Sequence, residues 1–504
     1  MTVSLIVDGQ TKSMSVPAGS KVSQVIQTAG ITIGSLDKVT PPVYTLITEG
    51  LEIKVTRGRE VFETKRSILP FERQTVRNED MPTGQTRLLQ PGTNGTQEIV
   101  YRYYYEDDKL VSTSISRSTV LDPALPEILM VGVQVPFAPL PIPGKLVYLS
   151  GGSAWLMQSS TSNRVPLITT GDLDGRILRL SNDGGWLLFT RKSSKASDVE
   201  INTLWALNLN DPKALPIDLK TSNVIHFADW DPTTISILRV LYSTVEPRSA
   251  APGWQANNDL YRMVLGTNGN LGVREKIIDA NTGGVYGWWG TDYFWAPVGS
   301  LLAYSRPDGV GLVSFANKAL ISQLTFAPLQ THSDWALIPG LAWGADGRTL
   351  FVVSHAPPPE LVNPEESPNF DLMAISLDSN VTVRLVQGSG MFAYPSVSSP
   401  RQVGKERSYE LAYLQALSKN QSDTSGYRLV VMDRDGSNHR ILFPDAGSPG
   451  LEPQTPLWAP APVSYMEGDF LAVIYQGNLW LVDAATGKSH QVTSDGLMQK
   501  LEWK

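Results

Sequence analysis

The sequence contains no cysteine and only five histidines, which restricts the chemistry that its side chains can perform. Disulfides and thiolate metal sites are excluded, and no histidine pair has metal-ligand spacing, so we expect no metal or other cofactor. The net charge is −7 with no basic face to compensate for it, which argues against a nucleic-acid partner. No signal peptide and no apolar run of membrane-spanning length are recognisable.

The chain is rich in the residues that make turns. Its 504 residues include 42 glycines and 35 prolines, a composition that suits many short strands. A chain of this length exceeds one hydrophobic core and predicts several domains. The clearest boundary is the segment 135–144, whose prolines at 136, 139, 141 and 143 favour an extended linker.

Residues 1–58 predict a small α+β domain. The sequence alternates around Asp8-Gly9, a dipeptide typical of a hairpin turn. Ser20 is placed to cap a helix formed by KVSQVIQTAG, which has one apolar face and ends in glycine. Residues 45–57, with a glycine at the turn, predict a closing hairpin.

Residues 59–134 read as extended, polar strands separated by glycine-containing turns, with glycines at 84, 92, 95 and 132. A fifth turn holds Asp107-Asp108, and aspartate tolerates the left-handed geometry that glycine would otherwise supply. With the turn MPTG and the segment QPGTNG, the whole stretch resembles the five-glycine (G-five) domain. The preceding VDG turn, VSQVIQTAGI helix and IKVTRGRE exit resemble the ubiquitin-like domain found before G-five domains in bacterial cell-wall proteins.

The resemblance implies an all-β, elongated module of the cell wall that binds N-acetylglucosamine-containing glycan or acts as an adhesive spacer. Tyr101, Tyr103 and Tyr104, followed by Tyr105, offer rings that can stack on sugars. The structural alternative is that Tyr101, Tyr103 and Tyr105 line one strand face and that alternation leaves Tyr104 exposed.

Residues 145–504 repeat two strand patterns, and each pattern occurs seven times. The strand LWLVD recurs as AWLMQ, LWALNL, LYRMVL, GLVSF, DLMAISL and YRLVVMD. The strand PLWAP recurs as ILRLSNDG, FADWDP, YFWAP, LAWGADG, YPSVSSP and LEWK. Such spacing is typical of four-stranded propeller blades.

The end of the chain predicts how the propeller closes. After four short strands in residues 454–493, the chain adds one more copy of the opening strand, ending at Trp503. We expect this strand to lie beside the one that begins at Leu146 and to complete the first blade with LVYL, AWLMQ and VPLIT. The motifs resemble TolB-type propellers, which often have six blades. The repeats in this chain favour seven, with six as the alternative.

Successive strands of a blade run in opposite directions, so two kinds of loop share one face of the propeller. The long insertions are mostly of these kinds, and we predict one elaborated face opposite a face of tight turns. Loops on a rigid scaffold commonly carry binding residues. The candidates on this face are Trp254, Tyr286, Trp288, Trp289, His332, Asp334, Trp335 and His355, with Glu360, Glu365 and Glu366. The alternative for the pair Trp288 and Trp289 is packing between blades.

Catalytic motifs are scarce. No G-x-S-x-G motif and no phosphate-binding glycine loop occurs. The segment 433–438 imitates the start of a calcium loop, but its twelfth position is Pro444, so we expect a hairpin turn. Carboxylates across the propeller channel remain candidates for a glycosidase pair, because the sequence does not give their separation.

These features favour a non-catalytic, extracytoplasmic protein of the bacterial cell surface, with any signal or lipid anchor outside this sequence. Peptidoglycan or another wall glycan is the expected partner of the G-five domain, and a surface or envelope protein is the expected partner of the propeller face. The alternative is a propeller enzyme, a glycan hydrolase or lyase or a peptidase, that these modules anchor to the wall. A third hypothesis is that the N-terminal domains only dimerise the chain.

Overall fold

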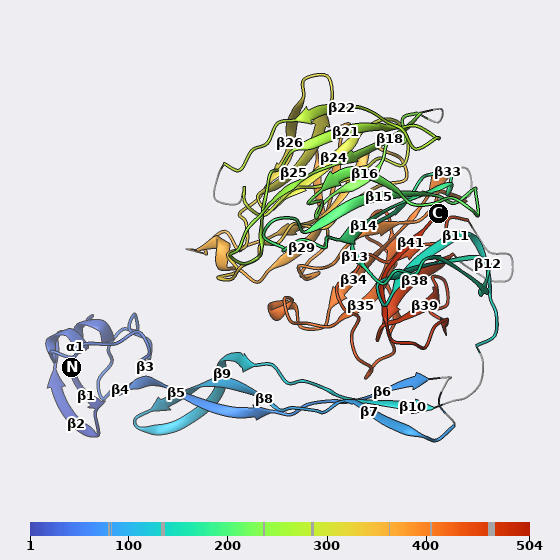
Figure 1. The fold of residues 1–504 in the computed structure, drawn as a ribbon. Coiled ribbons are helices and arrows are strands. Elements are labelled where there is room, and N and C mark those ends of the chain that lie inside the picture. Colours follow the sequence, from blue (N-terminus) through green and yellow to red (C-terminus); the bar gives the residue numbers. More distant parts are fainter. Residues whose placement is uncertain are drawn as a thin grey trace. The chain divides into compact units, whose positions relative to one another are not determined.

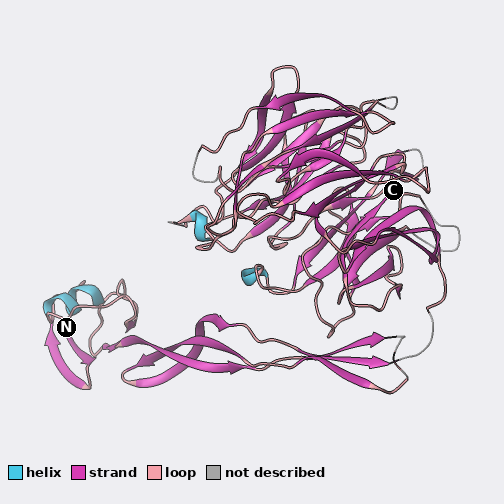
Figure 2. Cartoon of the chain, viewed as in Figure 1, coloured by secondary structure: helices cyan, strands magenta, loops and turns pink. Residues whose placement is uncertain are grey.

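The computed structural model describes residues 1–78, 81, 83–132, 137–234, 237–283, 287–361, 363–403, 406–461 and 469–504. It divides into two compact units. One comprises residues 1–75 and 86–130, and the other comprises residues 76–85 and 131–504. Strands dominate both units (Figures 1 and 2).

The N-terminal domain has a mixed sheet with the strand order β2-β1-β4-β3, one helix and a core of apolar side chains. The elements are β1 (Thr2–Val7), β2 (Gln10–Ser15), α1 (Val22–Thr28), β3 (Lys38–Thr40) and β4 (Glu52–Thr56). The hairpin at Asp8-Gly9 is confirmed, with both residues at positive φ. Lys21 rather than Ser20 occupies the N-cap. The closing hairpin over residues 45–57 is wrong, because β4 pairs with β1 and β3 instead.

The G-five domain is built from two three-stranded sheets. The first has the order β5-β8-β9, from β5 (Gly58–Leu69), β8 (Gly95–Glu106) and β9 (Lys109–Asp122). The second has the order β6-β10-β7, from β6 (Arg73–Asn78), β7 (Thr86–Gln90) and β10 (Glu127–Gly132). β5 pairs with β8 in unbroken antiparallel register from end to end.

The turn residues of this domain explain its glycine pattern. Asp107 and Asp108 have φ values of 43° and 59°, which confirms that aspartate takes the left-handed geometry expected at this turn. A Cβ atom at Gly95 would collide with the backbone of residues 122–124, so a side chain is excluded there by close approach. The turn at Asp107-Asp108 therefore depends on left-handed backbone geometry, whereas Gly95 is required by the close approach of another backbone segment.

Across the described part of residues 137–504, the chain forms seven antiparallel blades, which confirms the seven-bladed prediction. Given from the innermost strand outward, the first three blades are: β41 (Met498–Trp503), β11 (Pro141–Ser150) and β12 (Ser153–Ile168); β13 (Leu173–Leu180), β14 (Trp186–Lys192), β15 (Asn202–Asn208) and β16 (Ile217–Ser222); β17 (Ala228–Trp230), β18 (Leu238–Tyr242), β21 (Leu260–Leu265) and β22 (Leu271–Ile278).

The remaining four blades follow in chain order: β23 (Asp292–Trp295), β24 (Leu302–Arg306), β25 (Gly309–Ser314) and β26 (Ala319–Thr325); β27 (Leu341–Trp343), β28 (Thr349–His355), β29 (Phe370–Ser376) and β30 (Thr382–Val386); β31 (Ser396–Val397), β34 (Glu410–Ala416), β35 (Tyr427–Asp433) and β36 (Arg440–Phe443); β37 (Leu457–Trp458), β38 (Phe470–Tyr475), β39 (Asn478–Asp483) and β40 (Ser489–Gln491). The segment 433–438 forms the predicted turn between β35 and β36.

The two ends of the propeller meet as predicted. β41 pairs with β11 so that Trp503 lies opposite Leu146, and these strands lie side by side in Figure 1. Two details of the prediction are wrong. The first blade has three strands, because the VPLI residues continue β12, and β11 already begins at Pro141, within the predicted linker.

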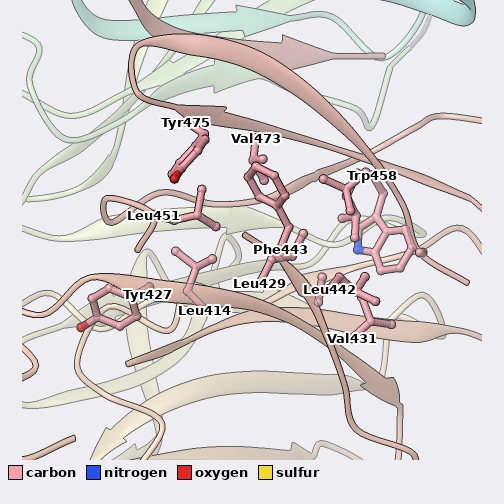
Figure 3. Close-up of a cluster of buried hydrophobic side chains, with 14 of the residues drawn as sticks. Leu414, Tyr427, Leu429, Val431, Leu442, Phe443, Leu451, Trp458, Val473 and Tyr475 are labelled. Carbon is pink, nitrogen blue, oxygen red and sulfur yellow. The ribbon is translucent and has the colours of Figure 1, made fainter. Parts of the chain in front are cut away.

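Neighbouring blades are held together by two devices. Apolar side chains of facing blades form shared clusters, and Figure 3 shows the one between blades six and seven, where Phe443 lies between residues of both. In three blades of the described part of the chain, the recurring tryptophan of the innermost strand also donates its indole N–H to the backbone of the preceding blade. Trp230 bonds to Arg179 O, Trp343 to Phe294 O and Trp458 to Ser396 O, over 3.1, 2.8 and 3.2 Å. The repeated tryptophan is therefore a structural residue.

Long insertions lie on both faces of the propeller. The predicted face carries the hairpin of β19 (Val245–Pro247) and β20 (Trp254–Ala256), and the 3-10 helices η1 (Pro364–Glu366) and η2 (Lys419–Gln421). The opposite face is not confined to tight turns, because β32 (Arg401–Val403) and β33 (Glu406–Ser408) form a hairpin between the first two strands of blade six.

Candidate functional site

The predicted sugar-stacking tyrosines lie on β8. The ring centroids of Tyr101 and Tyr103 are 6.3 Å apart, and Lys65 Nζ lies 5.7 and 6.0 Å from them. The Tyr104 hydroxyl donates to Leu36 O over 3.4 Å. All three tyrosines are half-buried. Tyr104 is therefore not the exposed residue of the structural alternative, because the adjacent ubiquitin-like domain contacts it.

Two predicted tryptophans of the propeller face contact each other. Trp288 Nε1 donates to Trp254 O over 3.0 Å, and the Trp254 ring lies edge-on to His226 with centroids 4.7 Å apart. Trp289 is half-buried nearby in sequence, and Tyr286 lies outside the described residues. The contacts of Trp254 and Trp288 hold the loop after β22 against the β19–β20 hairpin, so Trp288 packs against an insertion of blade three.

The loop between β26 and β27 carries His332 and Asp334 at its surface. His332 Nε2 lies 3.9 Å from Glu366 Oε1, and both side chains are more than half exposed. Asp334 accepts a hydrogen bond from Ser333 Oγ over 3.2 Å. Glu360 and Glu365 are also exposed. These residues come from two loops, between β26 and β27 and between β28 and β29, and form an open, acidic surface.

His355 is enclosed rather than presented. Its side chain is buried at the end of β28, with Nδ1 2.6 Å from Ala327 O and Nε2 2.8 Å from Ser367 O. Both partners are carbonyl acceptors, and a neutral imidazole carries a single N–H, so the ring donates to one of these loops and packs against the other. This position supports a structural role for His355.

Trp335 is a predicted residue that lines a cavity of the propeller channel. The cavity has a volume of about 330 Å³ and is also bounded by Phe392, Tyr394, Arg179 and Asp292. Phe392 contacts both other rings, with centroid distances of 6.3 Å to Trp335 and 5.9 Å to Tyr394. The volume falls at the lower end of the range of roughly 300–1,000 Å³ for small-molecule sites.

A larger cavity of about 990 Å³ adjoins the first and is lined by the innermost strands of the propeller. The two cavities share Arg179 in their walls. Arg179 Nη1 donates to Glu502 Oε2 over 3.1 Å, joining β13 to β41. Burial opposes the charge of Arg179, but the carboxylates of Glu502 and Asp229 raise its pKa. The guanidinium therefore stays charged in the channel.

Burial shifts the pKa of three further groups around the channel. It raises the pKa of Asp292 to about 7, although Arg179 and Lys500 partly offset the effect. Burial and the positive charge of Arg179 lower the pKa of Lys500 to about 8. Burial also lowers the pKa of His226, to about 4, and its Nδ1 lies 3.7 Å from Asp292 Oδ1, too far for a hydrogen bond. Near neutral pH, His226 is uncharged and Asp292 is partly protonated.

Sequence reasoning missed Arg179, Asp292 and Lys500. Each is a charged residue on an innermost strand, within the segments ILRL, DYFW and MQKLEW. Side chains alternate along these strands, and some of them point toward the channel. A charged residue within the repeated innermost-strand motif was therefore the feature of the sequence that could have indicated a channel site. Among the described residues, no group of three or more histidine, aspartate or glutamate side chains is arranged to hold a metal ion.

The fold defines a multidomain protein in which two small N-terminal domains precede a β-propeller. The family model of the G5 domain matches residues 60–134, and that of the G5-linked-Ubiquitin-like domain matches residues 3–43. The chain thus contains a G-five domain and its ubiquitin-like companion, as the motifs predicted. G-five domains occur in extracellular proteins. No helix in the described part of the chain has the length and apolarity to cross a membrane.

Solved structures similar to the chain fall into two groups. The G5 domain of an IgA1 protease is 21% identical, covering 16% of this chain and 94% of that chain with a TM-score of 0.12. TolB from Acinetobacter baumannii is 11% identical, covering 75% and 96% with a TM-score of 0.34. A prolyl endopeptidase is 12% identical, covering 70% of this chain and 49% of its own with a TM-score of 0.44.

Proposed function

We propose that this protein is a surface-associated, extracytoplasmic binding protein. Its G-five domain holds cell-wall glycan that contains N-acetylglucosamine, and its propeller presents the loop-bearing face to a surface or envelope protein. The observation that carries the glycan assignment is the pair Tyr101 and Tyr103 on one face of an open sheet. Their half-buried rings lie beside Lys65, which supplies hydrogen-bond donors for sugar hydroxyls and acetamido groups.

The sheet also suits an extended ligand. β5 and β8 run antiparallel over twelve paired positions, so the two rings lie on a long, regular strand rather than in a pocket. Glu63 on β5 lies directly opposite Tyr101 and forms an ion pair with Lys65 at 3.2 Å. Aromatic faces flanked by charged side chains match the alternating apolar and polar surfaces of a glycan strand.

Cosedimentation of the full chain with purified peptidoglycan tests this proposal. We expect the double variant Tyr101→Ala/Tyr103→Ala to lose most of the bound fraction, and soluble N-acetylglucosamine oligomers to compete with wild-type binding. Tyr44→Ala is the matched control, because Tyr44 is an exposed tyrosine of the ubiquitin-like domain and lies outside the sheet. Failure of the full chain to sediment, or equal binding by the double variant, would overturn the glycan assignment.

A propeller enzyme is the second candidate, and Asp292 is the observation that favours it. A carboxyl group with a pKa of about 7 in the lining of a cavity is suited to proton transfer near neutral pH. Glycan hydrolysis needs a second carboxylate, and Asp229 in the adjoining cavity is available. Release of reducing ends from wall glycan by the wild type, abolished in Asp292→Asn, would establish this activity.

A further inference from the structure

The cavity beside Trp335 has two chemically different walls. Trp335, Phe392 and Tyr394 form an aromatic wall, in which the Phe392 and Tyr394 rings are stacked with an interplanar angle of 17°. Arg179 and Asp292 lie in the same cavity lining. A ligand that fills this space therefore meets flat apolar surfaces together with a cation and a carboxyl group.

Neither polar residue is fully used by the fold. Among the described residues, the side chain of Arg179 makes one hydrogen bond, from Nη1 to Glu502, and is 43% exposed to the channel. Within the same residues, the Asp292 carboxyl group accepts no hydrogen bond, and its side chain is 36% exposed. Most N–H donors of Arg179 and both oxygens of Asp292 thus remain for a ligand.

The aromatic wall is built at a conformational cost. Tyr394 has a φ of 37°, a left-handed backbone geometry that a bulky residue rarely adopts. The backbone of Gly340 passes so close that a Cβ atom there would lie 2.9 Å from the Tyr394 ring. Strain of this kind gathers at binding sites, where the surrounding structure holds a side chain in a required position.

We infer that this cavity binds a sugar ring that carries a carboxylate. The apolar face of a pyranose stacks on the aromatic wall, the carboxylate pairs with the free edge of the Arg179 guanidinium, and a ring hydroxyl bonds to Asp292. A neutral sugar leaves the N–H donors of Arg179 that do not bond to Glu502 without an anionic acceptor, and an aromatic acid leaves Asp292 without a hydroxyl partner. The site therefore uses both walls fully only for an acidic sugar.

The test compares two ligands that differ only in the carboxylate, methyl β-D-glucuronide and methyl β-D-glucoside. Binding to the full chain is followed by titration calorimetry. We expect the glucuronide to bind at least about tenfold more tightly, because a charge-assisted pair with arginine is gained. N-acetylphenylalanine, which has a ring and a carboxylate but no hydroxyl, should bind more weakly than the glucuronide. Equal binding of the two glycosides, or tighter binding of N-acetylphenylalanine, would overturn the assignment.

Variants locate the site. Arg179→Gln should weaken glucuronide binding at least about tenfold and leave the glucoside unchanged, and Trp335→Ala should weaken both about three- to tenfold. Trp289→Ala is the control, since Trp289 lines neither cavity. Arg179→Gln also removes a partner of Glu502, so Arg179→Lys, which keeps the charge but not the planar fork, separates binding from folding. Unchanged affinity in Arg179→Gln and Trp335→Ala would place the ligand elsewhere.

This inference is independent of glycan binding by the G-five domain. Arg179→Gln should cosediment with peptidoglycan as the wild type does, and Tyr101→Ala/Tyr103→Ala should bind the glucuronide as the wild type does. If Arg179→Gln weakened binding to peptidoglycan, or if the double tyrosine variant weakened binding to the glucuronide, the two ligands would share one site and the inference of two independent sites would be wrong.

Discussion

The G-five domain and the propeller are both almost entirely β, yet different interactions stabilise them. Between Val55 and Ile142, no hydrophobic side chain among those described is buried, whereas every pair of neighbouring blades shares buried apolar residues or backbone bonds. The G-five sheet relies on backbone pairing and on side-chain contacts such as Arg59 over the Tyr105 ring, at 4.2 Å. One layer of strands cannot enclose a core, because both of its faces meet solvent.

This difference decides where each region can bind. In a single-layered sheet, the side chains of both faces stay accessible, so any stripe such as Tyr101 and Tyr103 can serve as a surface. In the propeller, the strands are occupied by packing, so accessible chemistry is confined to loops and to the channel. The predictions below test this contrast, from the largest expected effect to the smallest.

Phe189→Ala should be the most damaging substitution. Phe189 is fully buried in the cluster between blades one and two. Removing a buried aromatic side chain costs about 3–5 kcal/mol through lost burial and the cavity left behind. Differential scanning calorimetry should show the propeller transition at a lower temperature, with the transition of the N-terminal domains unmoved. A shift of both transitions would show that the two units unfold together.

Trp503→Phe should produce the next largest loss. The Trp503 indole donates to Pro143 O over 2.8 Å at the seam that closes the ring. Phenylalanine keeps most of the apolar contact but leaves a carbonyl without its donor, at a cost of about 1–3 kcal/mol. Trp458→Phe is the control, since it removes an indole bond between two blades, to Ser396 O, rather than one between the paired strands that close the ring. A much larger loss of stability in Trp503→Phe than in Trp458→Phe would show that the propeller depends more on the strand pairing that closes the ring than on the contact between blades six and seven.

The closure of the propeller was predicted correctly because the C-terminal strand repeats the innermost-strand pattern, and the first blade lacked a strand of that kind beside Leu146. Seven copies of each strand fix the number of blades, and the leftover copy ending at Trp503 needs a place beside Leu146. The hairpin over residues 45–57 failed for the opposite reason. Its strand β4 pairs with β1 and with β3 (Lys38–Thr40), and β3 has three residues and no alternating pattern, so only tertiary pairing defines it.

The candidate site was only partly predictable. Loop position pointed to Trp335, which does line the cavity, but equally to Trp254, which packs against His226. Both are tryptophans in long insertions, and only the folded neighbours distinguish them. Arg179 and Asp292 lie on strands, and whether a strand residue faces the channel depends on register that a short, irregular strand does not reveal.

Asp37→Asn should destabilise the N-terminal domain by about 1–3 kcal/mol at pH 7. Hydrogen bonds from Gly34 and Gly58 N–H and the Arg57 guanidinium lower the pKa of Asp37, despite some burial. A lowered pKa contributes stability above the unfolded value near 3.9, and that stability is lost as pH falls through the folded pKa. Thermal unfolding at pH 7 and at pH 2.5 should therefore show a smaller difference between variant and wild type at the lower pH. A difference that does not shrink as the pH falls would contradict the electrostatic explanation.

Asp292→Asn should stabilise the propeller at high pH, whereas Asp37→Asn destabilises the N-terminal domain. Burial raises the pKa of Asp292 to about 7, so the folded state binds this proton more tightly than the unfolded chain does. Ionisation therefore removes stability progressively between the unfolded pKa near 3.9 and about pH 7. The variant should stabilise the propeller by about 1 kcal/mol or less at pH 8, because channel water screens the charge, and should match the wild type at pH 3.5. Destabilisation at pH 8 would show that the carboxylate is paired.

Phe62→Ala should have the smallest effect, although it is the same substitution as Phe189→Ala. The Phe62 side chain on β5 is 55% exposed, so its removal leaves no cavity and loses little burial. The remaining cost is the lower strand preference of alanine, about 1 kcal/mol or less, in the transition of the N-terminal domains. A loss as large as that of Phe189→Ala would contradict the contrast between the two regions. It would mean that this sheet face is covered in solution, and a concentration-dependent shift in sedimentation velocity would identify a second copy of the chain as the cover.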